Sequence, residues 1–282
     1  MSKNNSPIFI GGAGRSGTTL LRVILDSHPE ICCGPEFRMT PTLALLWENY
    51  DSRAHMLAEY GINKEANLQM FRNLFLTLTS RFLKESGKRR LAEKTPGNCT
   101  VFSQLHEIFP SSPLIQIIRD GRDVVASLRS QNWIDLRTGK AMDVTIDSRK
   151  AVEHWKNSIL KAREITKIDS ATKHYYEIRY EDLLNSTEIQ LRNLFNFLDE
   201  NWNHNVLEFH KVNRNLASEA SATQVNKPLY KTSIGRYKKI LTRQEGQIIW
   251  AEAGDLLIDL GYCKNEKWIE DLPKTSINGN SL

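Results

Sequence analysis

Six residues near the start of the chain, from Gly12 to Gly17, form the pattern G-x-x-x-x-G, which is typical of a loop that binds phosphate. The apolar run Ile8–Ile10 precedes this loop, and apolar residues follow it at helical spacing over 20–25. Glycines let the backbone approach an anion closely, and the amides at a helix start point toward it with a favourable dipole. This order therefore favours a phosphate loop over the alternative, a glycine-rich turn with a solvated arginine.

The loop departs from the nucleotide-triphosphatase pattern, because Thr18 and Thr19 stand where that pattern has lysine and a magnesium-binding hydroxyl. The cation is instead Arg15, inside the loop. A guanidinium fork suits a compact tetrahedral anion such as a 5′-phosphate or a sulfonate. We therefore expect a nucleotide that has no γ-phosphate, and we expect no metal ion.

A second anion site is predicted at Arg119, which follows the apolar run 113–118. Ser127 lies two helical turns further on, so that both side chains can share one phosphate. The alternative is an arginine that pairs with Asp120 or Asp123 in a tight turn. Two phosphate sites on neighbouring strands imply a nucleotide that is phosphorylated at two positions.

Strands that alternate with helices must hold these two sites together. Short apolar runs predict strands at 8–10, 31–33, 90–93, 113–118 and 174–179. Helical patterns cover 17–27, 40–50, 65–86, 102–108, 124–128, 145–168, 187–198 and 242–259, and 213–241 reads as a long loop. This alternation predicts an α/β fold in which helices flank a parallel sheet, with ligands at the carboxyl ends of the strands. The helices at 40–50 and 65–86 are expected to cap the site.

Length and composition predict a single domain over 1–264 and a polar tail over 265–282. The chain has 38 basic and 33 acidic residues, and a net charge of +5 is too small to predict nucleic-acid binding. No apolar run approaches the roughly 18 residues of a membrane span, and the start lacks the core of a signal peptide. The four cysteines lack metal-binding spacing, so reduced thiols and a cytoplasmic location are expected.

At both anion sites, the sequence resembles the sulfotransferases that use 3′-phosphoadenosine 5′-phosphosulfate (PAPS). The resemblance extends through IRYEDLL (178–184) and KPLYKTSIGRYKKIL (227–241). Within that family the chain is most similar to the protein-tyrosine sulfotransferases. The run RSGTTLLRVILDSHPEICCGPEFRM (15–39) aligns with theirs without a gap, and AEKTP (92–96) resembles their segment with a lysine before Asp-Pro. The resemblance implies a P-loop-like sulfotransferase fold.

The resemblance also implies roles for individual residues. The 5′-phosphosulfate would be held by Arg15, Ser16, Gly17, Thr18 and Thr19, and the 3′-phosphate by Arg119 and Ser127. Tyr180 would meet the adenine, and cofactor phosphate would be contacted by Lys227, Ser233, Gly235 and Arg236. Glu36 falls on the catalytic base of the family, Lys94 on its catalytic lysine, and Arg38 is expected to contact the acceptor.

These roles suit sulfuryl transfer, in which positioning and electrostatic stabilisation supply most of the effect, by analogy with phosphoryl transfer. Arg15 and Lys94 can neutralise the charge that develops on the bridging oxygen as it leaves, so no metal is required. Glu36 can take the acceptor proton, a role worth about 10²–10⁴-fold. The alternative for Glu36 is a surface carboxylate that pairs with Arg38.

Departures from the tyrosine enzymes concern the acceptor side. Phe37 replaces a small polar residue and Pro35 an acidic one. Ala92 stands where the Golgi enzymes have a cysteine that pairs with the one matching Cys33, which agrees with a reducing compartment.

The preferred prediction is a PAPS-dependent sulfotransferase that acts on a tyrosine in a protein or peptide and releases 3′-phosphoadenosine 5′-phosphate (PAP). A carbohydrate or small-molecule hydroxyl is the competing acceptor. A nucleotide kinase or triphosphatase and a catalytically silent nucleotide-binding module are the other function classes, and a homodimer is possible.

Overall fold

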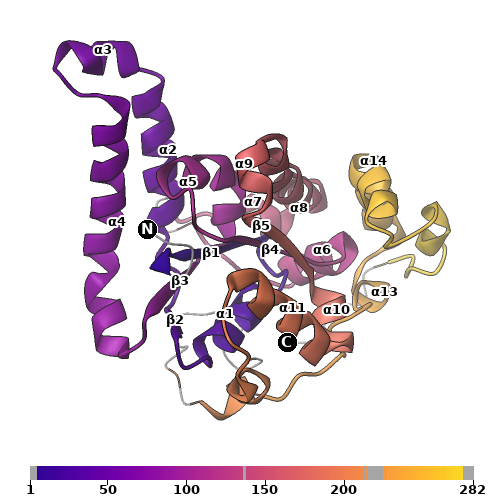
Figure 1. Cartoon of the computed structure of the whole chain (residues 1–282). Helices are drawn as coiled ribbons and strands as arrows, with labels where there is room; N and C mark the ends of the chain where they lie inside the picture. The colour runs from indigo at the N-terminus through magenta and orange to yellow at the C-terminus, as the bar shows by residue number, and fades with distance from the viewer. Residues whose placement is uncertain (1–4, 136–137, 213, 215–224, 226, 276–282) are drawn as a thin grey trace.

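The computed structural model describes residues 5–135, 138–212, 214, 225 and 227–275. Within them, five parallel strands form a sheet in the order β2-β3-β1-β4-β5 (Figure 1). The strands are β1 (Ile8–Gly11), β2 (Ile31–Cys33), β3 (Arg90–Lys94), β4 (Leu114–Ile118) and β5 (Tyr175–Arg179). Each overlaps a predicted strand, and the predicted α/β fold with a parallel sheet is confirmed. Strands β2 and β3 lie on one side of β1, and β4 and β5 on the other. At such a point a ligand crevice opens at the carboxyl ends of the strands.

Strand β1 is buried on both faces. This burial holds the carboxyl end of the strand in place, and the phosphate loop begins there. Ile8 and Ile10 pack into the core beside α1 (Thr18–Asp26) and α11 (Thr187–Leu198). Phe9 points to the opposite core, where its ring centroid lies 5.4 Å from that of Phe75 and 5.3 Å from that of Phe109. Burying a side chain of this size contributes about 1.5–3 kcal/mol.

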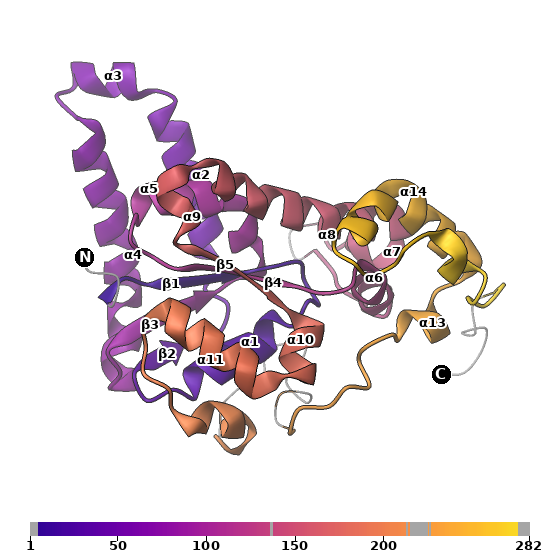
Figure 2. The ribbon, with the colours of Figure 1, turned by 45° about the vertical axis from the view of Figure 1, so that its right-hand side comes forward.

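Helices cover both faces of the sheet. Figures 1 and 2 show α1, α10 and α11 along one face and α5, α8 and α9 along the other. The remaining bounds are α2 (Met39–Asp51), α3 (Ala54–Glu59), α4 (Lys64–Ser86), α5 (Phe102–Ile108), α6 (Gly121–Arg129), α7 (Asp143–Ile146), α8 (Ser148–Arg163), α9 (Asp169–Thr172), α10 (Tyr180–Asn185), α13 (Tyr237–Ile240) and α14 (Arg243–Asp259). Short 3-10 helices are η2 (Pro96–Val101), η3 (Glu164–Lys167), η4 (His204–Lys211) and η5 (Glu266–Ile269). In both views, α3 and the adjoining ends of α2 and α4 project beyond the sheet, while the rest of α4 lies beside it.

The prediction of one helix over 145–168 is wrong, because Asp147 interrupts it. Asp147 has extended backbone angles, and its carboxylate accepts a hydrogen bond of 2.7 Å from the Arg149 amide, so it caps the start of α8. This cap separates α7 from α8, and η3 follows α8.

The C-terminal third of the chain differs from its prediction in detail. Within the predicted loop 213–241, the described residues include the helical turn α13, while 213, 215–224 and 226 lie outside the described residues. In the predicted tail, η5 and the buried side chain of Leu272 pack against α14. The division of the chain at residue 264 remains a prediction. Among the described helices, none is long and apolar enough to cross a bilayer.

Candidate active site

The phosphate loop, Gly12–Gly17, joins the end of β1 to the start of α1. Gly17 has a φ of +98°, and a Cβ at this position would lie 2.5 Å from Cδ2 of Tyr180. Only glycine meets both conditions without strain. The loop therefore packs against the Tyr180 ring, to which the resemblance assigns the adenine, and the first amides of α1 have no partner within the helix itself.

The Arg119 guanidinium lies behind this loop at the end of β4. Its NH1 donates to the Arg15 carbonyl at 3.0 Å, its NH2 donates to the Ser233 carbonyl, and its Cζ lies 4.8 Å from the centroid of the Tyr180 ring. Arg15 in turn donates from Nε to Ser127 Oγ at 3.1 Å. Four of the residues predicted to hold the phosphates therefore form one contiguous group with Tyr180, namely Arg15, Arg119, Ser127 and Ser233.

Two features of this group fit an anionic ligand. Burial and the neighbouring guanidinium groups of Arg119 and Arg236 lower the pKa of Arg15, so an anion between these cations would relieve their repulsion. Ser16 Oγ and Arg119 Nε are buried and have no hydrogen-bond partner within the described structure. Buried polar atoms of this kind call for a partner. The donors and charges therefore fit the phosphates of PAPS.

Asp123 ties the late loop, residues 227–237, to this group. Its carboxylate accepts hydrogen bonds from the amides of Gly235 at 2.8 Å and Tyr237 at 2.9 Å. In the same loop, Ser233 Oγ lies 2.7 Å from the hydroxyl of Tyr180. From the sequence, Asp123 was expected only as the alternative partner of an arginine in a turn, and its carboxylate does lie 3.7 Å from NH2 of Arg119. Its role as an anchor involves residues more than 100 positions away, and no local pattern indicates it.

Glu36 and Lys94 meet on the acceptor side. Nζ of Lys94 lies 3.0 Å from Oε1 of Glu36, and the Lys94 side chain is fully buried. Nε of Arg38 lies 3.1 Å from Oε2 of the same carboxylate. The pair with Arg38, which was the alternative for Glu36, thus exists together with the Glu36–Lys94 pair. A carboxylate held between two cations can accept a proton from a hydroxyl through its remaining lone pairs.

A cleft of about 720 Å³ joins the two sides, a volume typical of small-molecule sites. The predicted site residues that line it are Arg15, Gly17, Thr18, Thr19, Glu36, Arg38, Arg119, Tyr180 and Lys227. The others, Ser16, Lys94, Ser127, Ser233, Gly235 and Arg236, are not part of its lining. No residue of α2 or α4 lines it either, so the expectation that these helices cap the site is wrong.

One wall of the cleft was not predicted from the sequence. Trp133, Ile134 and Met142 line it from a short antiparallel bridge between Ile134 and Ala141. Beside them, Nε2 of His154 accepts a hydrogen bond of 3.3 Å from the amide of Gly14. Burial lowers the pKa of His154, which favours the neutral ring that can accept this bond. Asp135 and Gly139, which are residue types that favour turns, were a signal in the sequence for this wall.

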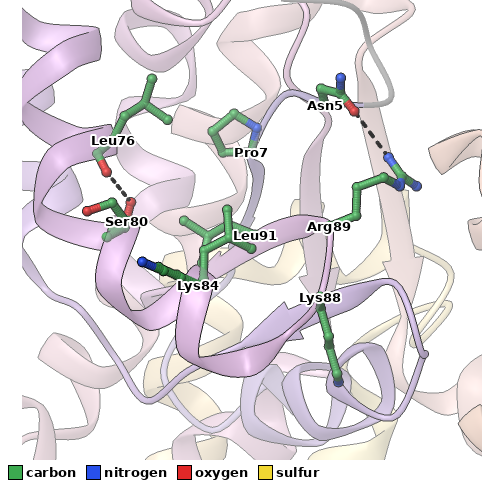
Figure 3. A pocket seen from close by; sticks show the side chains of 10 residues that line it. Asn5, Pro7, Leu76, Ser80, Lys84, Lys88, Arg89 and Leu91 are labelled. Carbon is green, nitrogen blue, oxygen red and sulfur yellow. Dashed lines mark hydrogen bonds between the residues drawn. The ribbon is translucent and has the colours of Figure 1, made fainter.

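A second hollow, of about 410 Å³, lies near the amino ends of β1 and β3 (Figure 3). Two of the three cations that line it already have partners within the fold. Arg89 donates to both oxygens of Glu200 at 2.8 and 2.9 Å, and Lys88 donates to the Ile31 carbonyl at 3.0 Å. We therefore place the candidate site in the larger cleft.

Comparison with known proteins agrees with this geometry. A model described as the sulfotransferase family matches residues 7–204, which span both anion sites and the Glu36–Lys94 pair. The chain belongs to the sulfotransferase family.

Curated relatives of this sulfotransferase include protein-tyrosine sulfotransferases. The Drosophila melanogaster protein is 30% identical over 94% of this chain, and protein-tyrosine sulfotransferase A of Caenorhabditis elegans is 31% identical over 79% of it. The chain covers 55% and 58% of these two relatives, little more than half of their length.

Solved structures share the fold of this sulfotransferase. The sulfotransferase domain of a Synechococcus olefin synthase superposes with a TM-score of 0.59 at 20% identity, covering 89% of this chain and 95% of that one. Mouse sulfotransferase SULT7A1, solved as a complex with PAP, gives 0.54 at 14% identity, covering 92% of this chain and 88% of that one.

Proposed function

We propose that this sulfotransferase transfers a sulfuryl group from PAPS to the hydroxyl of a tyrosine in a protein or peptide. The observation that carries the proposal is that Arg15, Arg119 and Glu36 line one cleft. Lys94 lies directly behind Glu36. The tyrosine acceptor is further supported by the protein-tyrosine sulfotransferases among the relatives.

PAPS, when bound, supplies the sulfuryl group and a phosphate leaving group. Arg15, the first amides of α1 and Ser16 Oγ would hold the 5′ end, and Arg119 with Ser127 the 3′-phosphate. Tyr180 offers a ring face for the base. Fixed donors of this kind need no reorganisation during the reaction, which is why they stabilise developing charge well.

On the acceptor side, Glu36 accepts the hydroxyl proton at a carboxylate oxygen. The salt bridge from Lys94 Nζ holds the carboxylate in place, and the same ammonium can offset negative charge that develops at the donor. The exposed guanidinium of Arg38 is available to an acidic acceptor at the mouth of the cleft.

We also propose a reducing, cytoplasmic setting. The four cysteines are free thiols, and Cys32 and Cys33 lie in the cores on opposite faces of the sheet. Such thiols have no requirement for an oxidising compartment.

The test is incubation with labelled PAPS and a panel of tyrosine peptides, glycans and phenols. Label in the tyrosine peptides supports the proposal, while strong glycan labelling with none in peptides overturns the tyrosine acceptor. Tight PAP binding without any transfer would favour a silent nucleotide-binding module. Magnesium-dependent turnover of ATP would favour the kinase or triphosphatase class.

A further inference from the structure

Glu93 is a buried carboxylate to which the mechanism above gives no part. It precedes Lys94 on β3 and pairs in register with Phe9 of β1. Successive strand side chains point to opposite faces. Lys94 therefore points toward Glu36, while Glu93 points away from it and is 4% exposed. A buried carboxylate is costly unless hydrogen bonds satisfy it.

Two side chains donate directly to this carboxylate, and the Thr40 side chain and the Phe37 amide, in the loop that carries Glu36, also lie against it. Thr95 Oγ1 donates to Oε1 of Glu93 at 2.6 Å, and Asn98 Nδ2 donates to Oε2 at 2.7 Å. The same Asn98 nitrogen donates to the Ile10 carbonyl at 3.1 Å, on the strand that leads into the phosphate loop. Burial raises the pKa of Glu93, and the hydrogen bonds from Thr95 and Asn98, together with the Thr40 side chain and the Phe37 amide, oppose that shift.

The hydrogen bond from Thr95 has a directional consequence. A hydroxyl has a single hydrogen, and Thr95 donates it to Glu93, so its oxygen lone pairs face elsewhere. They accept the Arg38 amide at 3.0 Å. Arg38 has a φ of +60°, a left-handed conformation that costs energy in a non-glycine residue and persists only where its surroundings hold it. Arg38 ends the acceptor loop, residues 34–38, which carries Glu36.

We propose that Glu93 is a positioning residue that acts through Thr95 to hold the acceptor loop, and so to hold Glu36 against Lys94. The Arg38 amide donates to Thr95 Oγ1, and Thr95 Oγ1 donates to the Glu93 carboxylate. A charged final acceptor strengthens consecutive hydrogen bonds of this kind. Pro96, next to Thr95, accepts the Gly12 amide at 3.0 Å, so the same segment also contacts the phosphate loop. This inference rests on the proposed sulfuryl transfer.

The test compares isosteric variants of the complete chain. Thr95→Val removes the hydroxyl at constant shape, Thr95→Ser keeps it, and Glu93→Gln replaces one acceptor oxygen by a donor. We expect Thr95→Val and Glu93→Gln to lower kcat about 10- to 100-fold, because small displacements of a catalytic group cost that much. The Kd for PAP should stay within about 2-fold, and Thr95→Ser should retain wild-type kcat. Unchanged kcat in the first two variants, or an equal loss of PAP affinity, would overturn the inference.

A second measurement is independent of transfer. Hydrogen–deuterium exchange over residues 36–40 should become faster in Thr95→Val and Glu93→Gln and stay at the wild-type rate in Thr95→Ser. If the exchange is the same in all four proteins, Glu93 does not hold the loop. If it rises as expected while the wild type transfers no sulfuryl group to any acceptor, the proposed function fails and the structural link stands.

Discussion

Nε of Arg15 donates a hydrogen bond of 3.1 Å to Oγ of Ser127. Arg15 belongs to the loop after β1, and Ser127 to the helix after β4, so this contact joins the two predicted phosphate sites. The sites are therefore coupled, and a nucleotide with two phosphates would engage both through neighbouring groups.

Ser127→Ala tests this coupling. We expect the variant to bind PAP about 10-fold more weakly, because hydrogen bonds to charged groups contribute about 1.5–3 kcal/mol. Binding of 5′-AMP should change much less. Calorimetric titration measures both constants. Ser130→Ala is the matched control, since Ser130 Oγ donates to the Ala126 carbonyl on the same helix. Equal losses for the two nucleotides would contradict the assignment.

Gly17→Ala tests the contact between the phosphate loop and Tyr180. The new methyl group would lie 2.5 Å from the tyrosine ring. Gly87→Ala is the control, because Gly87 also has a positive φ but has open space around it. We expect Gly17→Ala to lower the free energy of unfolding by about 1–3 kcal/mol more than the control does. Urea denaturation gives this difference, and equal values would show that the ring is not packed against the loop.

Asp123→Asn tests the anchor of the late loop through pH. Burial raises the pKa of Asp123, so on acidification it takes up a proton at a higher pH than an ordinary aspartate. Its bonds to Gly235 and Tyr237 then weaken, and we expect the Kd for PAP to rise. The folded chain binds this proton more tightly than the unfolded chain does, so this protonation does not itself unfold the protein. Titrations across acidic pH should show this rise in the wild type and not in the variant. Identical pH profiles would refute the anchor.

Glu36→Gln tests the base. We expect kcat to fall by about 10²–10⁴-fold with the Kd for PAP unchanged, since the amide cannot accept the hydroxyl proton. Steady-state assays with the best acceptor measure the first quantity, and titration the second. Glu85→Gln is the control, because Glu85 forms a surface salt bridge with Arg81 far from the cleft. A variant with wild-type kcat would remove Glu36 from the mechanism.

Much of the fold was predictable because its determinants are local. The apolar runs of β1 and β4 are buried on both faces, and such strands appear in a sequence as continuous hydrophobic segments. The helix 145–168 was predicted as one piece because its apolar periodicity continues across Asp147. An aspartate interrupts an apolar periodicity only slightly, but it is strongly preferred at the N-cap of a helix. In the structure Asp147 occupies the N-cap of α8.

The candidate site was predictable where a compact motif exists, as in the phosphate loop. It was not predictable where the partners lie far apart in sequence. Asp123 contacts the late loop more than 100 residues away, and Thr95 contacts Arg38 across 57 residues. Nor does any periodicity distinguish Glu93 from the charged residues beside it, since its importance comes from burial and from the donors around it.

The most direct measurement of the central claim is a calorimetric titration of the wild-type protein with PAP and with 5′-AMP under identical conditions. If Arg15, Arg119 and Ser127 hold two phosphates of one nucleotide, PAP should bind at least about 10-fold more tightly than 5′-AMP. Equal affinity for the two nucleotides would contradict the account.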